Sequence, residues 1–501
     1  MLFNSFEFLI FFPVFLCIYF ILPQRHRWFF TLIASLYFYM CYDPKYIFIL
    51  MFSTGISWYS AKMISENKDE KVRKTWLALG IILNITQLVI FKYLNFFDEN
   101  FREIFNFIGI NYPVPEPWFN NIILPIGISF FTFHTLAYTL DVYKGITPVE
   151  KNFAFYTLFV SFWPQLLAGP IPRANQLIPE LRKPVSIDYE RMKSGMIRMA
   201  IGMFKKVVIA DRLSMYVSHI FDNYEQATGW TVVLGASLFF IQVYCDFSGY
   251  SDIAIGASRI MGIKLMENFK RPFFAKNLAD FWTRWHISLS TWLTDYVFFY
   301  LGAYKSTGLK VVFNVIFVLT ICGLWHGANW PMVLSFTFIG GMMAVRYLWQ
   351  FNIVRQIKPS NLYQWSEKLL TDNVHRLITF FSLMFGFMLF RIQSALEHTQ
   401  AKGIDISWEK IAAKMYGNIF HLGEAGFFSE VVQHKGEVNF FLGIFFVFIL
   451  FLTEALCGDT QIEDKIVEKK KLIRWSIYIF MLISIIWFGV FNESEFVYFQ
   501  F

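Results

Sequence analysis

The stretch Gly323-Leu324-Trp325-His326-Gly327-Ala328-Asn329-Trp330 sets a histidine among apolar and small residues. Apolar runs flank it on both sides, at 311–321 and 332–339, and such runs are typical of helices that span a lipid bilayer. A protonatable ring is costly in hydrocarbon, so we expect His326 to face a cavity or a partner, which makes it a candidate functional residue. The alternative is a neutral histidine that is hydrogen-bonded between packed helices.

The composition of the whole chain agrees with this interpretation. Of its 501 residues, 56% are hydrophobic and 16% are charged, and the mean hydropathy is +0.45. These values exclude an ordinary soluble protein, and a net charge of +7 that is spread over loops does not indicate a nucleic-acid partner. The five cysteines are scattered singly, without metal-binding or redox spacing.

We therefore predict an all-α, polytopic protein of the cell (inner or cytoplasmic) membrane, with about 11–12 transmembrane helices and additional re-entrant and interfacial helices. The lipid bilayer is then its surrounding solvent. Apolar segments that we expect to form helices are 6–22, 28–42, 46–64, 76–94, 121–140, 196–212, 230–256, 377–392, 438–456 and 475–491, with a further pair that turns near Asn329.

Charged residues between these segments predict the topology. The basic segments 65–75, 173–206, 259–284 and 350–375 should lie in the cytoplasm, and the acidic loop 95–118 and both termini outside. The run at 152–169 ends in prolines that break a helix, and a full crossing there would place the next basic segment outside. We therefore expect residues 152–172 to re-enter from the cytoplasmic side.

Two further segments contain unusual polar residues. Asp246 and Asp252 lie near the end of an expected span, together with Ser248 and Ser251, and we interpret them as buried partners that anchor helix contacts. Residues 281–300 are amphipathic and rich in tryptophan, so they predict a helix along the membrane surface. His286 within that helix is, on sequence alone, an interfacial histidine.

Three motifs together resemble the membrane-bound O-acyltransferase family, most closely its alginate O-acetyltransferase branch. They are Tyr244-Cys245-Asp246-Phe247-Ser248-Gly249-Tyr250-Ser251-Asp252, Trp285-His286-Ile287-Ser288-Leu289-Ser290 and Gly323-Leu324-Trp325-His326-Gly327-Ala328. The resemblance extends from Met1-Leu2-Phe3-Asn4-Ser5 to Tyr498-Phe499-Gln500-Phe501. It implies one transmembrane domain over 1–501, with N-terminal helices at 1–120, a core at 121–350 and C-terminal helices at 351–501 around a central catalytic funnel.

The resemblance also implies site residues. The residue matching the family's catalytic histidine is His326, and a second essential position matches His286. Asn329-Trp330-Pro331-Met332 departs from the Trp-Thr-Phe-Val type of run that is common in the branch, which affects the expected acceptor preference. Residues expected to bind substrates are Trp325, Asn329, Trp285, Asp246, Ser248, Arg271 and Lys276.

The implied reaction moves an acyl group from a thioester to a hydroxyl, with His326 as general base. No tightly bound cofactor or metal is expected; acetyl-CoA or another acyl thioester is the co-substrate. The expected partners are the thioester or an acyl carrier protein, a polysaccharide acceptor of the cell envelope, and a separate extracytoplasmic acetyltransferase. Two alternatives stay open: D-alanyl transfer to teichoic acid by the same fold, and a polysaccharide or lipid transporter.

Overall fold

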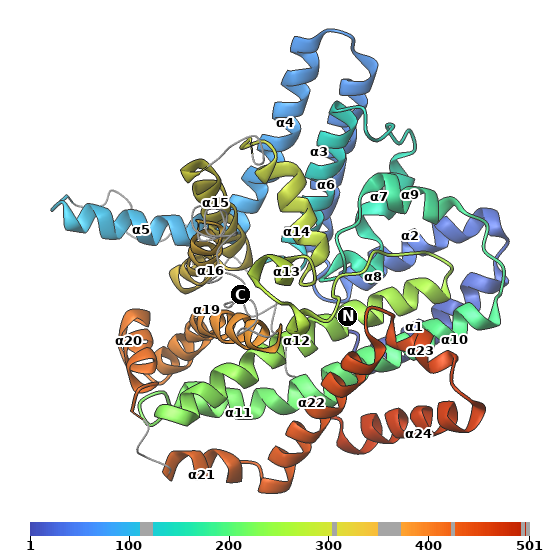
Figure 1. Ribbon diagram of the computed structural model, residues 1–501. Helices are drawn as coiled ribbons and strands as arrows, with labels where there is room; N and C mark the ends of the chain where they lie inside the picture. Colours follow the sequence, from blue (N-terminus) through green and yellow to red (C-terminus); the bar gives the residue numbers. More distant parts are fainter. Residues whose placement is uncertain (111–123, 303–307, 349–371, 422–425, 492–495, 497–501) are drawn as a thin grey trace, which may run out of the picture. The chain divides into compact units, whose positions relative to one another are not determined.

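The computed structural model describes residues 1–110, 124–302, 308–348, 372–421, 426–491 and 496 (Figure 1). Every regular element in these ranges is helical. Contacts divide the chain into two compact units. Unit 1 consists of Met1–Met196 with Ala254–Met266, and unit 2 consists of Ile197–Ile253 with Glu267–Phe501.

Unit 1 contains a bundle in which α3, α4 and α6 pack against one another. Gly80 on α4 allows this close approach, because a Cβ at that position would lie 3.0 Å from Ser60 and 3.2 Å from Thr139. The elements of unit 1, up to the helix that continues into unit 2, are α1 (Phe6–Ile21), α2 (Gln24–Met40), α3 (Tyr46–Glu66), α4 (Glu70–Leu88), η1 (Val89–Tyr93), α5 (Leu94–Phe107), α6 (Ile128–Tyr143), α7 (Phe153–Ser161), α8 (Trp163–Leu166), α9 (Ala174–Arg182) and the start of α10 (Tyr189–Met203).

Two predictions for unit 1 can be compared with these elements. The acidic loop expected at 95–118 is wrong in its first part, because α5 continues the helix to Phe107. Apolar residues recur at helical spacing through that segment, and this periodicity favours a helix despite the acidic residues on its other face. The nine residues of α7 would rise only about 14 Å, less than half of a bilayer core, which fits a segment that does not cross. The side from which it enters stays a prediction.

Unit 2 contains the motifs that the sequence singled out. Its elements after α10 are η2 (Phe204–Ala210), α11 (Asp211–Asp222), α12 (Gly229–Ile260, which continues into unit 1), η3 (Pro272–Phe274), α13 (Leu278–Trp282), α14 (Ile287–Leu293), η4 (Thr294–Phe298), α15 (Leu309–His326), α16 (Trp330–Leu348), α19 (Asp372–Ala401), α20 (Trp408–Asn418), α21 (Gly426–Gln433), α22 (Glu437–Cys457), α23 (Ile462–Val467) and α24 (Lys471–Phe488).

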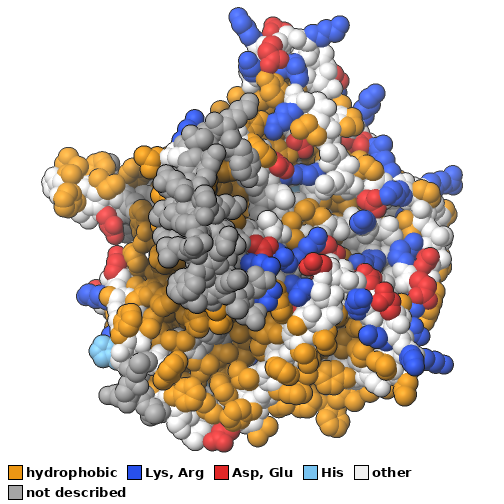
Figure 2. All heavy atoms as spheres, in the orientation of Figure 1, with side chains coloured by type: hydrophobic (Ala, Val, Ile, Leu, Met, Phe, Trp, Pro, Cys, Tyr) orange, Lys and Arg blue, Asp and Glu red, His pale blue; other side chains and the backbone are white. Residues whose placement is uncertain are grey.

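Within the described ranges, eight helices are long and apolar enough to cross a membrane. Several other predicted spans are helices of fewer than 18 residues, such as α2 with 17 and α6 with 16. Figure 2 shows hydrophobic side chains gathered over α22 and α24, where Leu472 and Trp487 are 80% and 79% exposed. Such a surface requires lipid around it. Most of the predicted cytoplasmic segment 350–375 lies outside the described residues.

The close crossing of α10 and α12 positions the charged residues of unit 2. A Cβ on Gly202 would lie 2.6 Å from the carbonyl oxygen of Gly249, and a Cβ on Gly249 would lie 2.7 Å from that of Gly202. Only glycine at both positions lets the two backbones approach this closely. The π-helical segment η2 follows directly and presents buried lysines toward α12.

Candidate active site

His326 is the last residue of α15 and is 7% exposed. Its ring stacks on Phe336 of α16, with the ring centroids 4.6 Å apart. The two helices approach closely because Gly323 has no side chain: a Cβ there would lie 2.7 Å from the carbonyl oxygen of Met332. An apolar helix hairpin thus fixes the position of this imidazole.

His286 lies between α13 and α14 in a left-handed backbone conformation, with φ 43° and ψ 52°. A residue other than glycine pays about 1–3 kcal/mol for this conformation, so the surroundings must hold it. The N–H of Ser290 donates to the carbonyl of His286 at 2.9 Å, and the N–H of Ile287 donates to the carbonyl of Asn268 at 2.9 Å. The single helix that we predicted over 281–300 is therefore wrong: the chain turns at His286.

The structure brings the two predicted histidines together. Their ring centroids are 6.4 Å apart, and Trp325 lies 6.1 Å from the ring of His286 and 4.9 Å from that of His326. Phe247 of α12 contacts His286 at 4.6 Å. Both ring nitrogens of His286 are buried, and neither has a hydrogen-bond partner among the described residues. Because buried polar groups are normally hydrogen-bonded, this imidazole has capacity left for a ligand.

Two of the other predicted residues near these motifs, Trp285 and Asn329, have clear structural contacts. Trp285 packs on Phe281, with ring centroids 5.2 Å apart, and is 3% exposed. The side chain of Asn329 accepts a hydrogen bond from the N–H of Met332 at 2.9 Å, which caps the first turn of α16. Ser248 is buried on α12. A direct role for these side chains in substrate binding stays a prediction.

A network of buried charges lies on α10, η2 and α12. Arg198 contacts three carboxylates: Asp252 at 2.6 Å, Glu267 at 2.6 Å and Glu463 at 2.8 Å. Lys205 pairs with the second oxygen of Asp252 at 2.8 Å. We call these five residues the ionic network. Each cation in it faces carboxylate oxygens, so its desolvation is offset by charge-assisted hydrogen bonds.

This network corrects the interpretation of the basic segment. Arg198, Lys205 and Lys206 belong to the basic segment 173–206, but they lie within the helix predicted over 196–212 and are only 4–6% exposed, so they are buried partners of carboxylates and not loop cations. Lys206 pairs with Asp211 at 2.8 Å and with Asp246 at 2.7 Å. The prediction that Asp246 and Asp252 anchor helix contacts is confirmed. Carboxylates in an apolar span were the signal that buried cations had to be nearby.

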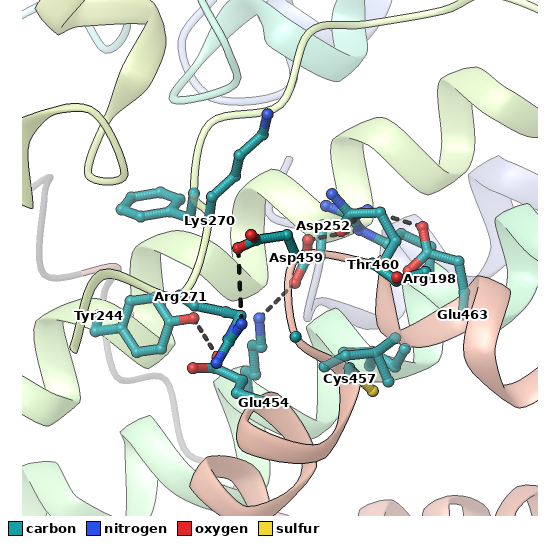
Figure 3. A pocket seen from close by; sticks show the side chains of 16 residues that line it. Arg198, Tyr244, Asp252, Lys270, Arg271, Glu454, Cys457, Asp459, Thr460 and Glu463 are labelled. Carbon is teal, nitrogen blue, oxygen red and sulfur yellow. Dashed lines mark hydrogen bonds and ion pairs between the residues drawn. The ribbon is translucent and has the colours of Figure 1, made fainter. Parts of the chain in front are cut away.

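A cavity of about 50 Å³ adjoins the ionic network, enough for a few water molecules. Figure 3 shows Tyr244 and Glu454 in its wall, where the phenol donates a hydrogen bond to one carboxylate oxygen. The other carboxylate oxygen of Glu454 is buried, without a partner in the described part of the chain. Phe269 lines this cavity and its ring lies 6.5 Å from that of His286. The ring of Phe269 therefore lies between the cavity and His286.

Of the two cations predicted to bind substrate, only Arg271 lies in the wall of this cavity. Arg271 lines it, stacks over Phe274 at 4.5 Å and lies 3.6 Å from Asp459 (Figure 3). Lys276 is not in the cavity wall, and its backbone N–H donates to Asp280 at 3.0 Å. Arg284 also lies 3.6 Å from Asp459. Sequence reasoning did not identify Tyr244, Glu454 or Asp459 as part of a site.

These observations define a polytopic helical membrane protein with a buried pair of histidines. A model of the membrane-bound O-acyltransferase family matches residues 124–392, which include both histidines. The chain belongs to this family, and it is an O-acyltransferase.

Relatives with known assignments fall into three groups. The chain is 33% identical to a probable alginate O-acetylase of Azotobacter vinelandii, over 85% of this chain and 79% of that protein. It is 35% identical to a peptidoglycan O-acetyltransferase of Helicobacter pylori, over 60% and 61%. It is also 30% identical to a teichoic acid D-alanyltransferase of Bacillus subtilis, over 56% and 72%.

Proposed function

We propose that this chain transfers acetyl groups from a cytoplasmic thioester to hydroxyls of an extracytoplasmic polysaccharide, or to a partner transferase that completes the reaction. The observation that carries the proposal is the pair of buried imidazoles, His326 and His286, whose rings are 6.4 Å apart. The long match to O-acetylases supports acetyl as the transferred group.

His326 acts as the general base in the proposed reaction. In the proposal the ring of His326 is neutral, and a neutral imidazole can accept a proton at one of its nitrogens. The ring takes the proton of the acceptor hydroxyl as its oxygen attacks the thioester carbonyl. When the carbon–sulfur bond breaks, the same proton passes to the leaving thiolate, which yields an ester and a free thiol.

His286 positions one of the substrates beside this base. A neutral imidazole donates from one nitrogen and accepts at the other, so it can hold a hydroxyl or a carbonyl oxygen in place. The aromatic surroundings, Trp325, Phe247 and Phe336, exclude water that would otherwise hydrolyse the thioester.

The donor's phosphates are proposed to approach from the cavity beside Arg271. This cation lies at the cavity wall and faces Asp459, which is itself 87% exposed. Exposed ion pairs of this kind are weak, so a phosphate can replace the carboxylate. Asp459 then competes with the donor for the same guanidinium.

The test compares the polysaccharides of cells with and without the intact gene by mass spectrometry. Secreted polymers, peptidoglycan and teichoic acids are analysed separately for ester-linked groups. Loss of acetyl from one polymer, restored by the wild-type gene and not by His326→Ala, is the expected result. An unchanged acetyl content in every polymer contradicts the proposed function.

D-alanyl transfer is the second candidate, because the similarity to a teichoic acid D-alanyltransferase covers 56% of this chain. The same experiment separates the two reactions. Loss of D-alanine esters with unchanged acetyl esters would favour this alternative.

A further inference from the structure

A second cavity is built from residues of unit 1 alone. It has a volume of about 450 Å³, and typical small-molecule sites measure roughly 300–1,000 Å³. Its wall includes the end of α1, the first turn of α2 and the segment 180–185. The proposed acyl transfer uses none of these residues.

Hydrogen bonds fix the two sides of this cavity relative to each other. The amide of Gln24 donates to the carbonyl of Lys183 at 3.1 Å. The guanidinium of Arg27 donates to the carbonyl of Val185 at 2.6 Å and to that of Leu22 at 3.0 Å. The first turn of α2 is therefore tied to the segment after α9, and the cavity between them has a defined shape.

The charge in the cavity wall is positive. Arg25, Arg27, Arg182 and Lys183 are accompanied by one acidic residue, Glu180. Lys183 pairs with Glu180, and Arg182 pairs with Glu150 at 2.6 Å. Arg25 and Arg27 make no ion pair with any residue that the structure describes: Arg25 donates to His26, and Arg27 donates to carbonyl oxygens. Two positive charges in this wall are thus not neutralised.

The rest of the wall is apolar and aromatic. Arg27 lies over the ring of Tyr19 at 5.2 Å, and Arg182 lies over that of Phe155 at 4.8 Å. On α1, Ile21 is 82% exposed, and on α2, Phe29 is 50% exposed, as expected for side chains in lipid. Basic and aromatic side chains beside a lipid-facing surface are typical of the membrane interface.

We propose that this cavity binds the phosphate-bearing headgroup of an anionic lipid, with Arg25 and Arg27 facing the phosphate. The hydrocarbon chains then follow the apolar surface at Ile21 and Phe29. Basic pockets between helices on the cytoplasmic side are suited to such headgroups, and the basic residues at 173–195 predict that side. This binding is separate from the acyl transfer and goes beyond it.

Native mass spectrometry of the purified full-length chain tests the proposal. The probes are phosphatidylglycerol, phosphatidylcholine and inorganic phosphate. We expect the wild-type chain to retain phosphatidylglycerol in preference to phosphatidylcholine, and Arg25→Glu to weaken that retention about tenfold. Arg25 is exposed, so the variant should fold, which its thermal melting checks. Lys68→Glu is the matched control, because Lys68 is exposed, carries the same charge and does not line the cavity.

Three results would overturn the proposal. Equal retention of the two lipids removes the role of the negative charge. An equal loss in the Lys68 and Arg25 variants shows attraction to the whole surface instead of binding in the cavity. Displacement of phosphatidylglycerol by an equal concentration of inorganic phosphate identifies a site for the free anion, not for a lipid.

Discussion

Unit 2 holds two groups of buried polar side chains, and they differ in how their hydrogen-bonding groups are used. In the ionic network, Arg198 faces three carboxylates, so its donors are committed to contacts within the protein. At the histidine pair, both nitrogens of His286 are buried without a partner among the described residues. Burial is common to both, but the imidazole of His286 has capacity left for a ligand. From this difference we propose that the network serves stability and that the histidines serve the chemistry.

The largest effect is expected at the centre of the ionic network. Arg198→Ala removes the cation that contacts three carboxylates, of which Asp252 keeps Lys205, and breaking a buried pair costs about 3–5 kcal/mol of unfolding free energy. Thermal unfolding in detergent should show a large loss of stability. Lys193→Ala is the control, since its pair with the 66% exposed Glu190 contributes only about 0–1 kcal/mol. Equal melting temperatures of the two variants would contradict the assignment of stability to the ionic network.

His326→Ala tests the proposed catalytic role of the histidine pair. We expect acyl transfer to fall by about a hundredfold or more, because the general base is lost, while the melting temperature changes little. His326→Gln should be equally inactive, since an amide cannot take the proton. His398→Ala is the control for activity, because it removes an exposed histidine. Recovery of activity in the Gln variant would indicate a structural hydrogen bond instead of a base.

Gly249→Ala tests whether the network depends on the close crossing of α10 and α12. The added methyl group would lie 2.7 Å from the carbonyl oxygen of Gly202, and overpacking of this kind costs about 1–3 kcal/mol. Gly341→Ala is the matched control, because nothing lies within 4 Å of its Cβ position. Thermal unfolding of both variants measures the difference. A stable Gly249 variant would contradict the importance of the crossing.

His286→Asn should reduce activity less than His326→Ala does. Asparagine tolerates the left-handed backbone, so the turn is kept while the imidazole is lost. If His286 positions a substrate, the KM of that substrate should rise more than kcat falls. Steady-state kinetics with each substrate varied separately provides the measurement. If kcat falls as far as in His326→Ala while KM is unchanged, His286 takes part in the chemical step.

The smallest effect is expected at Arg271. Arg271→Ala should raise the KM of the thioester donor several-fold with little change in kcat, as for an interaction made equally in the ground and transition states. Asp459→Asn should lower the same KM, because the competing carboxylate is removed. Lys276→Ala is the control, as Lys276 does not line the cavity. If all three variants have the same KM for the thioester donor, Arg271 does not bind the donor, and these charges serve only to orient the chain in the membrane.

The membrane helices were predictable because their signal is local. The predicted span 438–456 is α22 over Glu437–Cys457, and 230–256 lies within α12 over Gly229–Ile260. A run of apolar residues indicates a membrane helix by itself, because it does not depend on contacts with distant parts of the chain. His326 was a candidate because of its apolar surroundings, and His286 only through the family resemblance; the structure places the two rings 6.4 Å apart, and their catalytic roles stay predictions.

The buried charges and the turn at His286 were not predictable in the same way. Arg198 hydrogen-bonds to Glu463, which is 265 residues away in the sequence, so no local pattern distinguishes it from a loop cation. The left-handed backbone at His286 has no glycine or proline to mark it, and the hydrogen bond from Ile287 to Asn268 that helps to hold it is a tertiary contact. Local periodicity therefore predicted a continuous helix there.

The positive φ of His286 has a consequence for attempts to engineer this enzyme. Glycine would adopt the same backbone without strain but would leave the space of a buried ring empty, so a screen for thermostability alone should favour asparagine, which tolerates this backbone, and discard the imidazole. Any stabilised variant of this protein must therefore be selected for turnover at the same time. Conversely, a family member with glycine at this position would lack the substrate positioning that we propose for His286.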